Sequence, residues 1–246
     1  MKLALFADKE VGFEITKYLV ENYPEDLSLV ITKESNVISA LANSIGIPTY
    51  TSKSKNLDLT YPKESFDLGI LAWWPDLIRQ EVLDIAKYGF INTHPSLLPF
   101  NKGRYPNFWA IIEEVPFGVS IHKVKVEVDS GDILHQKEIP FDWTDNAESL
   151  YKKATEAMSA LFIQEYPQIR RLELVGQSQE GRLNPPRLTS EFHLMSEVKL
   201  DSQVRVRDFL NLLRAKTFSG HPGLIFEDNG VKFEVTINIK KSEDKK

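Results

Sequence analysis

Short runs of apolar residues alternate with amphipathic segments along the first part of the chain. The runs are typical of buried parallel strands and cover residues 3–7, 27–31, 47–50, 66–72 and 89–94. Between them, apolar residues recur at helical spacing, most clearly in 11–19, 37–42 and 77–86. Strands that alternate with helices in this way predict an α/β fold with an open, mostly parallel, Rossmann-like sheet flanked by helices.

The pattern changes in the second half of the chain. A long strand rich in β-branched residues is predicted for 118–128, and its return partner for 133–139. A long helix is predicted for 145–166, with Thr144 or Asp145 as its N-cap. The mostly parallel sheet is therefore expected to end in a pair of strands joined by a turn.

The last part of the chain predicts a small separate unit. A stretch with glycine and proline, 172–187, reads as the loop that leads into it. A helix is predicted for 204–215, and two apolar runs flank Asn229-Gly230, a pair that favours a tight hairpin turn. We therefore predict a main domain over residues 1–188 and a small C-terminal unit of a helix plus a β-hairpin over 189–246.

Composition excludes several classes of protein. Hydrophobic residues make up 42% of the 246 residues, so a sizeable core is expected, but no apolar stretch approaches the roughly 20 residues of a membrane span. The net charge of -5 argues against nucleic acid as a partner, because such surfaces are usually basic. The chain has no cysteine, which excludes disulfides and thiolate chemistry and favours the cytoplasm. The apolar N-terminal run ends at Asp8, too early for a secretory signal.

Two polar side chains stand at the end of the fifth predicted strand. Asn92 and His94 are two residues apart, so both point to the same face, at the sheet edge where ligands of open α/β sheets bind. An amide can hold a developing oxyanion, and an imidazole can carry a proton near neutral pH, which together suit acyl transfer. A carboxylate from Asp129 or Asp132 would orient the imidazole and stabilise its charge.

Each of these motifs also fits a structural role when taken alone. A histidine near a strand end is often a satisfied structural residue, and Asp-Ser-Gly-Asp is an ordinary turn sequence. A serine nucleophile, Ser96 or Ser120, fits poorly because neither lies in a Gly-x-Ser-x-Gly elbow.

In combination, two sequence blocks resemble the folate-dependent formyltransferases. The blocks are residues 91–99, followed by Gly103-Arg104, and residues 128–134. This family includes the methionyl-tRNA, glycinamide-ribonucleotide and sugar N-formyltransferases. By this resemblance Asn92, His94 and Asp129 match the catalytic residues of the family, and Asp129 is preferred to Asp132 because it precedes x-Gly.

The resemblance implies direct transfer of a formyl group from 10-formyltetrahydrofolate to an amine, leaving tetrahydrofolate, without a metal. Asn92 and a protonated His94 would stabilise the oxyanion, while Asp129 would hold His94 and help to move the amine proton. The folate is expected beside the fourth strand and the loop that follows it. The expected folate-binding residues are Trp73, Trp74, Pro75, Asp76, Leu77, Ile78 and Asp132.

Within the family, residues 102–111 look most like the sugar N-formyltransferases, and residues 210–218 and 221–223 resemble their short C-terminal unit. This resemblance implies a dTDP-linked amino sugar as substrate, typically a dTDP-4-amino-4,6-dideoxyhexose, a role in surface polysaccharide such as O-antigen, and a homodimer. The expected substrate-binding residues are Ser96, Lys102, Gly103, Arg104, Tyr105, Asn107, Trp109, Arg187, Arg214 and Lys216.

Other amines and other activities remain as alternatives. Methionyl-tRNA formyltransferases carry a larger C-terminal barrel, for which the roughly 55 residues after Ser190 are too few. Glycinamide-ribonucleotide formyltransferases usually lack such a tail. A hydrolase of 10-formyltetrahydrofolate would carry a regulatory domain in front, whereas this sequence begins at its first strand. A non-catalytic folate- or nucleotide-sugar-binding relative would not need all three of Asn92, His94 and Asp129.

Overall fold

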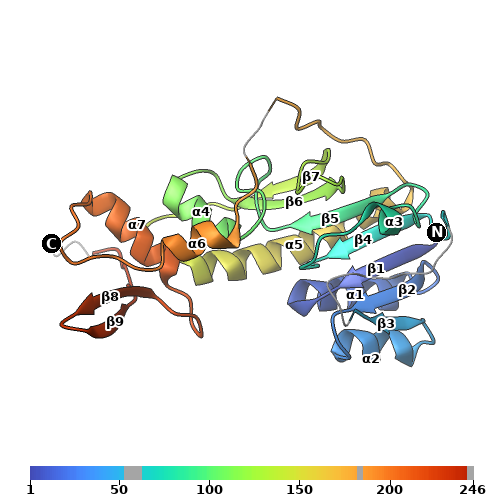
Figure 1. Ribbon diagram of the computed structural model, residues 1–246. Helices are drawn as coiled ribbons and strands as arrows, with labels where there is room; N and C mark the ends of the chain where they lie inside the picture. The colour runs from blue at the N-terminus through green and yellow to red at the C-terminus, as the bar shows by residue number, and fades with distance from the viewer. Residues whose placement is uncertain (53–62, 182–184, 243–246) are drawn as a thin grey trace.

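The computed structural model describes residues 1–52, 63–181 and 185–242, and within them a seven-stranded sheet forms the centre of the molecule (Figure 1). Its order is β3-β2-β1-β4-β5-β6-β7. The strands β1 to β5 pair in parallel, whereas β6 pairs antiparallel with both β5 and β7. The strands are β1 (Leu3–Ala7), β2 (Leu27–Thr32), β3 (Thr49–Thr51), β4 (Leu68–Ala72), β5 (Phe90–His94), β6 (Gly118–Lys123) and β7 (Ile133–Glu138). The predicted mostly parallel α/β sheet is thus confirmed.

Helices cover both faces of this sheet. They are α1 (Lys9–Asn22), α2 (Val37–Ser44), α3 (Gln80–Leu83), α4 (Pro106–Glu113) and α5 (Ala147–Arg170). Alternation along β1 directs Leu3 and Leu5 into the cluster that α1 and α5 cover, and Phe6 into a second cluster with α3 on the other face. Because both faces are buried, the central strands read as continuous apolar runs.

The strand predicted for 118–128 is wrong in its second half. The structure ends β6 at Lys123, and residues 124–132 form the connection to β7. The apolar positions change phase at the end of β6, from Val119 and Ile121 to Val124, Val126 and Val128, and Val126 is 65% exposed. Periodicity alone cannot tell a strand from a loop whose apolar side chains line a hollow.

Two helix predictions also need correction. Only Gln80–Leu83 of the stretch 77–86 is helical, and Leu77 is 73% exposed. The long helix begins at Ala147 with Asn146 as its N-cap, and Asn146 and Ser149 form a reciprocal capping box. Asp145 instead accepts a hydrogen bond from the Ser149 hydroxyl and pairs with Lys153 at 2.8 Å.

The C-terminal unit contains the predicted helix and hairpin. It consists of α6 (Thr189–Leu194), α7 (Val206–Lys216), β8 (Leu224–Asp228) and β9 (Val231–Val235), and it lies at the end of the molecule opposite α2 and β3 (Figure 1). Asn229 and Gly230 have φ of 49° and 79°, as a two-residue hairpin turn requires. Both α4 and α6 lacked a prediction. Residues 182–184 of the predicted loop and 243–246 of the predicted unit lie outside the described residues.

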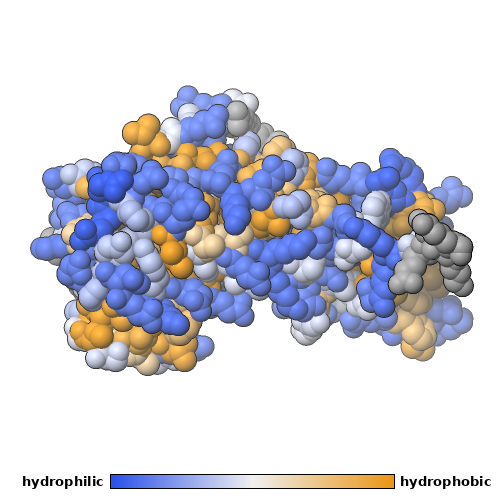
Figure 2. Space-filling model, turned by 180° about the vertical axis from the view of Figure 1, so that it is seen from behind, coloured by the Kyte–Doolittle hydropathy of each residue, from blue (hydrophilic) through white to orange (hydrophobic). Residues whose placement is uncertain are grey.

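Seen from behind, apolar side chains reach the surface in several places, two of which lie at opposite ends of the molecule (Figure 2). One area lies over α2 and β3, where Val37 is 66% and Tyr50 is 52% exposed. The other lies over the β8–β9 hairpin, where Val231 is 54% and Phe233 is 44% exposed. In the described ranges, no helix is long and apolar enough to cross a membrane.

Candidate active site

Four polar side chains meet at the carboxyl end of β5. Asn92 and His94 lie on β5, His122 lies opposite Asn92 on β6, and Asp129 comes from the turn that follows β6. Nδ1 of His94 lies 3.5 Å from one carboxylate oxygen of Asp129, and Nε2 of His122 lies 3.5 Å from the other. The amide nitrogen of Asn92 lies 3.2 Å from Nε2 of His122. The structure therefore brings together the three residues that the sequence singled out, and adds a second imidazole.

The turn after β6 places Asp129 between the two histidines. Gly131 allows this return, because a Cβ at that position would lie 1.8 Å from the carbonyl oxygen of Lys123. The main-chain N–H of Gly103 donates to the Asp129 carboxylate at 2.8 Å. A second loop thus binds the same carboxylate oxygen that faces His94.

Burial and neighbouring charges set the protonation of the site. Burial by itself would raise the pKa of Asp129, but the two imidazoles and the Gly103 N–H outweigh it and hold that pKa far below its ordinary value. Burial lowers the pKa of His94, and His122 adds to this effect, while Asp129 opposes it. At neutral pH the free protein therefore holds an ionised Asp129 beside a neutral His94. The protonated His94 that the resemblance implies for oxyanion stabilisation would therefore have to form during the reaction.

Hydrogen bonds indicate which ring nitrogens are free. Nδ1 of His122 lies 2.8 Å from the Lys123 carbonyl and donates to it, while its Nε2 lies within reach of both the Asn92 amide and the Asp129 carboxylate. Nδ1 of His94 faces Asp129, whereas its Nε2 is buried without a hydrogen-bond partner among the described residues. An unpaired buried acceptor is costly unless a ligand uses it. Nε2 of His94 is therefore the atom available to a substrate.

A cavity of about 140 Å³ opens onto these side chains. Five of the six loop residues expected to bind folate line it, namely Trp74, Pro75, Asp76, Leu77 and Ile78. The remaining lining residues are Leu71, Asn92, His94, Gly103, Arg104, His122, Val124, Lys125, Val126, Val128 and Asp129. The valines that extend the apolar pattern beyond β6 thus form one wall of this cavity.

Two of the expected folate-binding residues lie outside the lining. The ring of Trp73 packs edge-on against Tyr151, with centroids 5.8 Å apart. The carboxylate of Asp132 lies 4.0 Å from Lys123 and 3.5 Å from Lys125. The indole nitrogen of Trp74, by contrast, is buried without a partner in the described residues.

The expected substrate-binding residues divide into two groups. Gly103 and Arg104 line the cavity, and Arg104 donates to the Pro75 carbonyl at 2.8 Å, which connects its two walls. Lys102 is buried, which lowers its pKa against the pull of the nearby Asp129. These three residues belong to the loop whose Gly103 N–H binds the Asp129 carboxylate.

The other group lies outside the lining of the cavity. Tyr105 stacks on Phe192 at 4.0 Å, Ser96 is buried beneath β6, and Asn107 donates to the Ala147 carbonyl at 2.8 Å. The guanidinium of Arg187 lies 4.3 Å from the Trp109 ring centroid and pairs with Glu113 and Glu191. Arg214 lies over Trp143 at 4.7 Å, and Lys216 donates to the Phe192 carbonyl and to Ser196.

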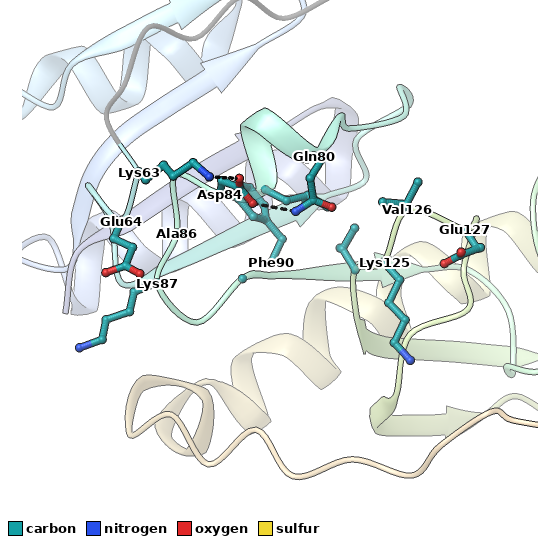
Figure 3. A pocket seen from close by; sticks show the side chains of 13 residues that line it. Lys63, Glu64, Gln80, Asp84, Ala86, Lys87, Phe90, Lys125, Val126 and Glu127 are labelled. Carbon is teal, nitrogen blue, oxygen red and sulfur yellow. Dashed lines mark hydrogen bonds and ion pairs between the residues drawn. The ribbon is translucent and has the colours of Figure 1, made fainter.

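A second, larger cavity of about 620 Å³ lies beyond Val124, Lys125 and Val126, which line both cavities (Figure 3). Three of its polar groups pair with one another, since Asp84 lies 2.8 Å from Lys63 and accepts from Gln80 at 2.7 Å. It contains none of Asn92, His94, His122 and Asp129. We therefore assign the chemistry to the smaller cavity, which contains these four side chains.

Sequence reasoning missed His122. The usable signal was the register of β5 and β6, which pairs Asn92 with His122 and so places the two side chains on one face. Within the described residues, no group of three or more His, Asp or Glu side chains is arranged to hold a metal ion.

Comparison with known proteins shows similarity over both parts of the chain. Residues 21–165 match the family described as formyl transferase, and residues 191–241 match the N-formyltransferase dimerization C-terminal domain. A methionyl-tRNA formyltransferase of Ehrlichia canis is 30% identical over 210 residues, which is 79% of this chain and 69% of that protein. The corresponding enzyme of Ehrlichia ruminantium (strain Gardel) is 32% identical over 175 residues, and the match covers 70% of this chain but only 57% of the relative.

Solved structures share the fold over nearly the whole chain. A sugar N-formyltransferase from a Shewanella species has a TM-score of 0.80 at 22% identity, and a 4-N formyltransferase from Francisella tularensis has 0.80 at 24% identity. Both matches cover 98% of this chain and 98% of the other. An N-formyltransferase from Helicobacter canadensis, solved with folinic acid and dTDP-3-aminofucose, has a TM-score of 0.73 at 18% identity over 94% of this chain and 86% of that one. At these identities the likeness establishes the fold alone.

Proposed function

The chain belongs to the formyl transferase family, and on that premise we propose that it transfers a formyl group from 10-formyltetrahydrofolate to the amino group of a nucleotide-linked amino-dideoxy sugar. The observation that carries this proposal is the convergence of Asn92, His94 and Asp129 on one small cavity, with Nε2 of His94 free. An amide donor, a neutral imidazole and an ionised carboxylate are the groups that acyl transfer to an amine requires.

The cavity suits a flat heterocycle with polar edges. Leu71, Ile78 and Val126 supply apolar walls, and the unpartnered indole N–H of Trp74 supplies a donor. The residues that would hold the folate are therefore those of the loop 74–78 and of the facing segment 124–128. When bound, the folate supplies the formyl group.

Each residue at the cavity mouth has a distinct task in the mechanism. The second N–H of the Asn92 amide, which His122 does not use, donates to the formyl oxygen as negative charge develops on it. Nε2 of His94 accepts the proton that the attacking amine loses, so the imidazole becomes charged only during the reaction. The fixed negative charge of Asp129 stabilises the imidazolium that forms. With the folate bound, His94 would return this proton to the leaving nitrogen, which restores the neutral imidazole.

Several observations support an amino sugar as the acceptor. Solved sugar N-formyltransferases share this fold over nearly their whole length, and one of them was solved with a dTDP-linked amino sugar. Arg104 lines the cavity and supplies positive charge there, where a nucleotide diphosphate needs cationic partners. Surface polysaccharide such as O-antigen is the proposed destination of the product, and the cytoplasm is the proposed site of action.

The C-terminal unit supports a homodimer. Its residues 191–241 match a dimerization domain, and the β8–β9 hairpin exposes Val231 and Phe233 on one surface. Apolar surface of this kind is what a partner copy would cover. We propose the boundary between the two domains near residue 188.

Methionyl-tRNA is the second candidate acceptor, because the two curated relatives, at 30% and 32% identity, are named methionyl-tRNA formyltransferases. The net charge of -5 argues against this acceptor, because binding tRNA needs a basic surface. The described C-terminal residues also form a two-stranded hairpin rather than a barrel. We therefore rank the sugar acceptor first.

A turnover assay with 10-formyltetrahydrofolate tests this choice. The acceptors are dTDP-4-amino- and dTDP-3-amino-dideoxyhexoses, glycinamide ribonucleotide and methionyl-tRNA, with product mass as the readout. We expect a gain of one formyl group on an amino sugar. Formylation of methionyl-tRNA alone would overturn the acceptor while keeping the chemistry, and transfer to none of the amines would overturn the proposed activity.

A further inference from the structure

A buried glutamine outside the cavity holds the turn that carries Asp129. Gln179 lies in the segment that follows α5 and is 4% exposed. Its side-chain Nε2 donates to the main-chain carbonyl of Asp129 at 3.0 Å and to that of Gly131 at 2.6 Å. One amide group, 48 to 50 residues away in sequence, thus ties together two carbonyls of a single turn.

The hydrogen bonds inside this turn all go to a single carbonyl. The Ser130 hydroxyl donates to the Glu127 carbonyl at 2.9 Å, and the Ser130 main-chain N–H lies 3.4 Å from the same oxygen. Asp129 itself has a φ of 49°, in the left-handed region that disfavours residues with a side chain. Because the direction of the carboxylate follows the main chain that bears it, the position of Asp129 depends on groups that bind the turn from outside.

Gln179 is itself fixed by the strand that follows the turn. Two residues earlier, Gln177 exchanges two main-chain hydrogen bonds with Ile133 at the start of β7, of 2.9 and 2.8 Å. Gly176 permits this approach, since a Cβ there would lie 2.7 Å from the Ile133 carbonyl oxygen. The main chain that carries Gln179 is therefore held by hydrogen bonds to β7, and its side chain reaches both carbonyls of the turn.

We propose that Gln179 is a positioning residue, which holds the carboxylate of Asp129 against the imidazole of His94 without touching a substrate. This inference rests on the function proposed above for Asp129. The groups that act on His94 are Asp129, His122 and the main chain at Asn101. Lys102 acts on Asp129 in turn. Loss of the glutamine amide removes the two hydrogen bonds to the main chain of the turn and leaves the Gly103 N–H on the Asp129 carboxylate in place.

The test compares Gln179→Leu with the matched control Gln177→Leu. Gln177 is exposed and joins β7 through its main chain, so the same substitution there leaves the turn bound. The first readout is the ring pKa of His94, measured by NMR on labelled histidine and assigned with a His94→Ala sample. We expect this pKa to fall by about half a unit or more in Gln179→Leu, because an ionised Asp129 raises it in the wild type.

The second readout is steady-state kinetics. We expect kcat to fall about tenfold or more in Gln179→Leu, with KM for the amine within about threefold of the wild type, as for an interaction that matters in the transition state. The acid limb of the kcat profile should move to lower pH together with the His94 pKa. Gln177→Leu should change neither quantity.

An isosteric variant, Gln179→Glu, covers the case in which leucine disturbs folding. An ionised glutamate would repel both carbonyl oxygens, whereas a protonated one can donate to one of them. We therefore expect its activity relative to the wild type to rise as pH falls, which a purely structural defect would not produce.

The outcomes separate this inference from the proposed function. Loss of activity with an unchanged His94 pKa, or no change in either quantity, would overturn the positioning role. A His94 pKa that depends on Gln179, in a protein that formylates none of the amines tested, would uphold the positioning role and reject the function.

Discussion

At the scale of single residues, the neighbours of His94 and Asp129 push the two groups into opposite charge states. Burial keeps the imidazole neutral, while two imidazoles and the N–H of Gly103 keep the carboxylate ionised. Groups whose pKa values are driven apart in this way are typical of acid–base sites. The fixed negative charge is in place before any proton arrives.

The first prediction concerns the two groups themselves. We expect His94→Ala and Asp129→Asn each to lower kcat by at least ~100-fold, because each removes a positioned proton-handling or charge-stabilising group. Circular dichroism should show an unchanged fold. The control is His221→Ala, which removes an exposed imidazole and should keep wild-type turnover. Near-normal turnover of either site variant would refute the assignment.

The pH dependence follows from the direction of the His94 shift. The base must be neutral to accept a proton, and its pKa lies below the usual value of about 6.5. We therefore expect kcat to stay constant as pH falls from 8 through 6.5 and to decline only below that point. An acid limb centred above pH 6.5 in a kcat profile would contradict the neutral resting state.

Local pattern was enough to predict Asn92, His94 and Asp129. Two of them share a face through strand alternation, and the third precedes a glycine in a turn. His122 and Gln179 could not be found in this way. The role of His122 depends on the register of β6, and that of Gln179 on a contact 48 to 50 residues distant in sequence, which no local period encodes.

At the scale of elements, the apolar period predicted the buried strands well and the cavity walls poorly. β1 was predicted residue for residue because both of its faces are buried. Leu77 and Val126 belong to the same kind of pattern, but each lines the cavity instead of entering a helix or strand. The site is thus where local pattern and tertiary structure disagree, as expected for a functional region.

The N-cap of α5 provides a prediction of stability. Asn146 accepts from Ser149 at 2.9 Å and its own N–H donates to the Ser149 hydroxyl at 3.0 Å. We expect Asn146→Ala to lower the free energy of unfolding by about 1 kcal/mol, since it exposes a first-turn N–H. Urea denaturation would measure this loss, with Asn146→Asp as the control that keeps a capping oxygen. Equal stabilities of the alanine and aspartate variants would count against the cap.

At the scale of the whole molecule, the order of elements in sequence predicted the α/β class and the small C-terminal unit. It did not predict which strands are neighbours. Asp129 lies beside His94 because β6 pairs with β5 and the turn after β6 carries Asp129. α6 has no fully buried residue, so it carries no periodic apolar signal for a sequence to show.

The two exposed apolar areas give a test of the dimer. We expect Phe233→Glu on the hairpin to shift the protein from dimer to monomer, because a partner copy would have to bury the new charge. Val37→Glu, in the apolar area over α2, should leave the dimer intact. Light scattering after gel filtration measures both masses. A dimer that survives Phe233→Glu and dissociates with Val37→Glu would place the interface at the other end of the molecule.

The glutamine contact with the Asp129 turn has a consequence for the folding pathway. Closing a chain segment of this length is slower and entropically more demanding than forming a helix or a neighbouring strand pair. The amide of Gln179 can reach the turn only after α5 has packed on the sheet, since α5 lies between them in the chain. During refolding, helical signal should therefore return before catalytic competence, and recovery of activity would time the final step of assembly.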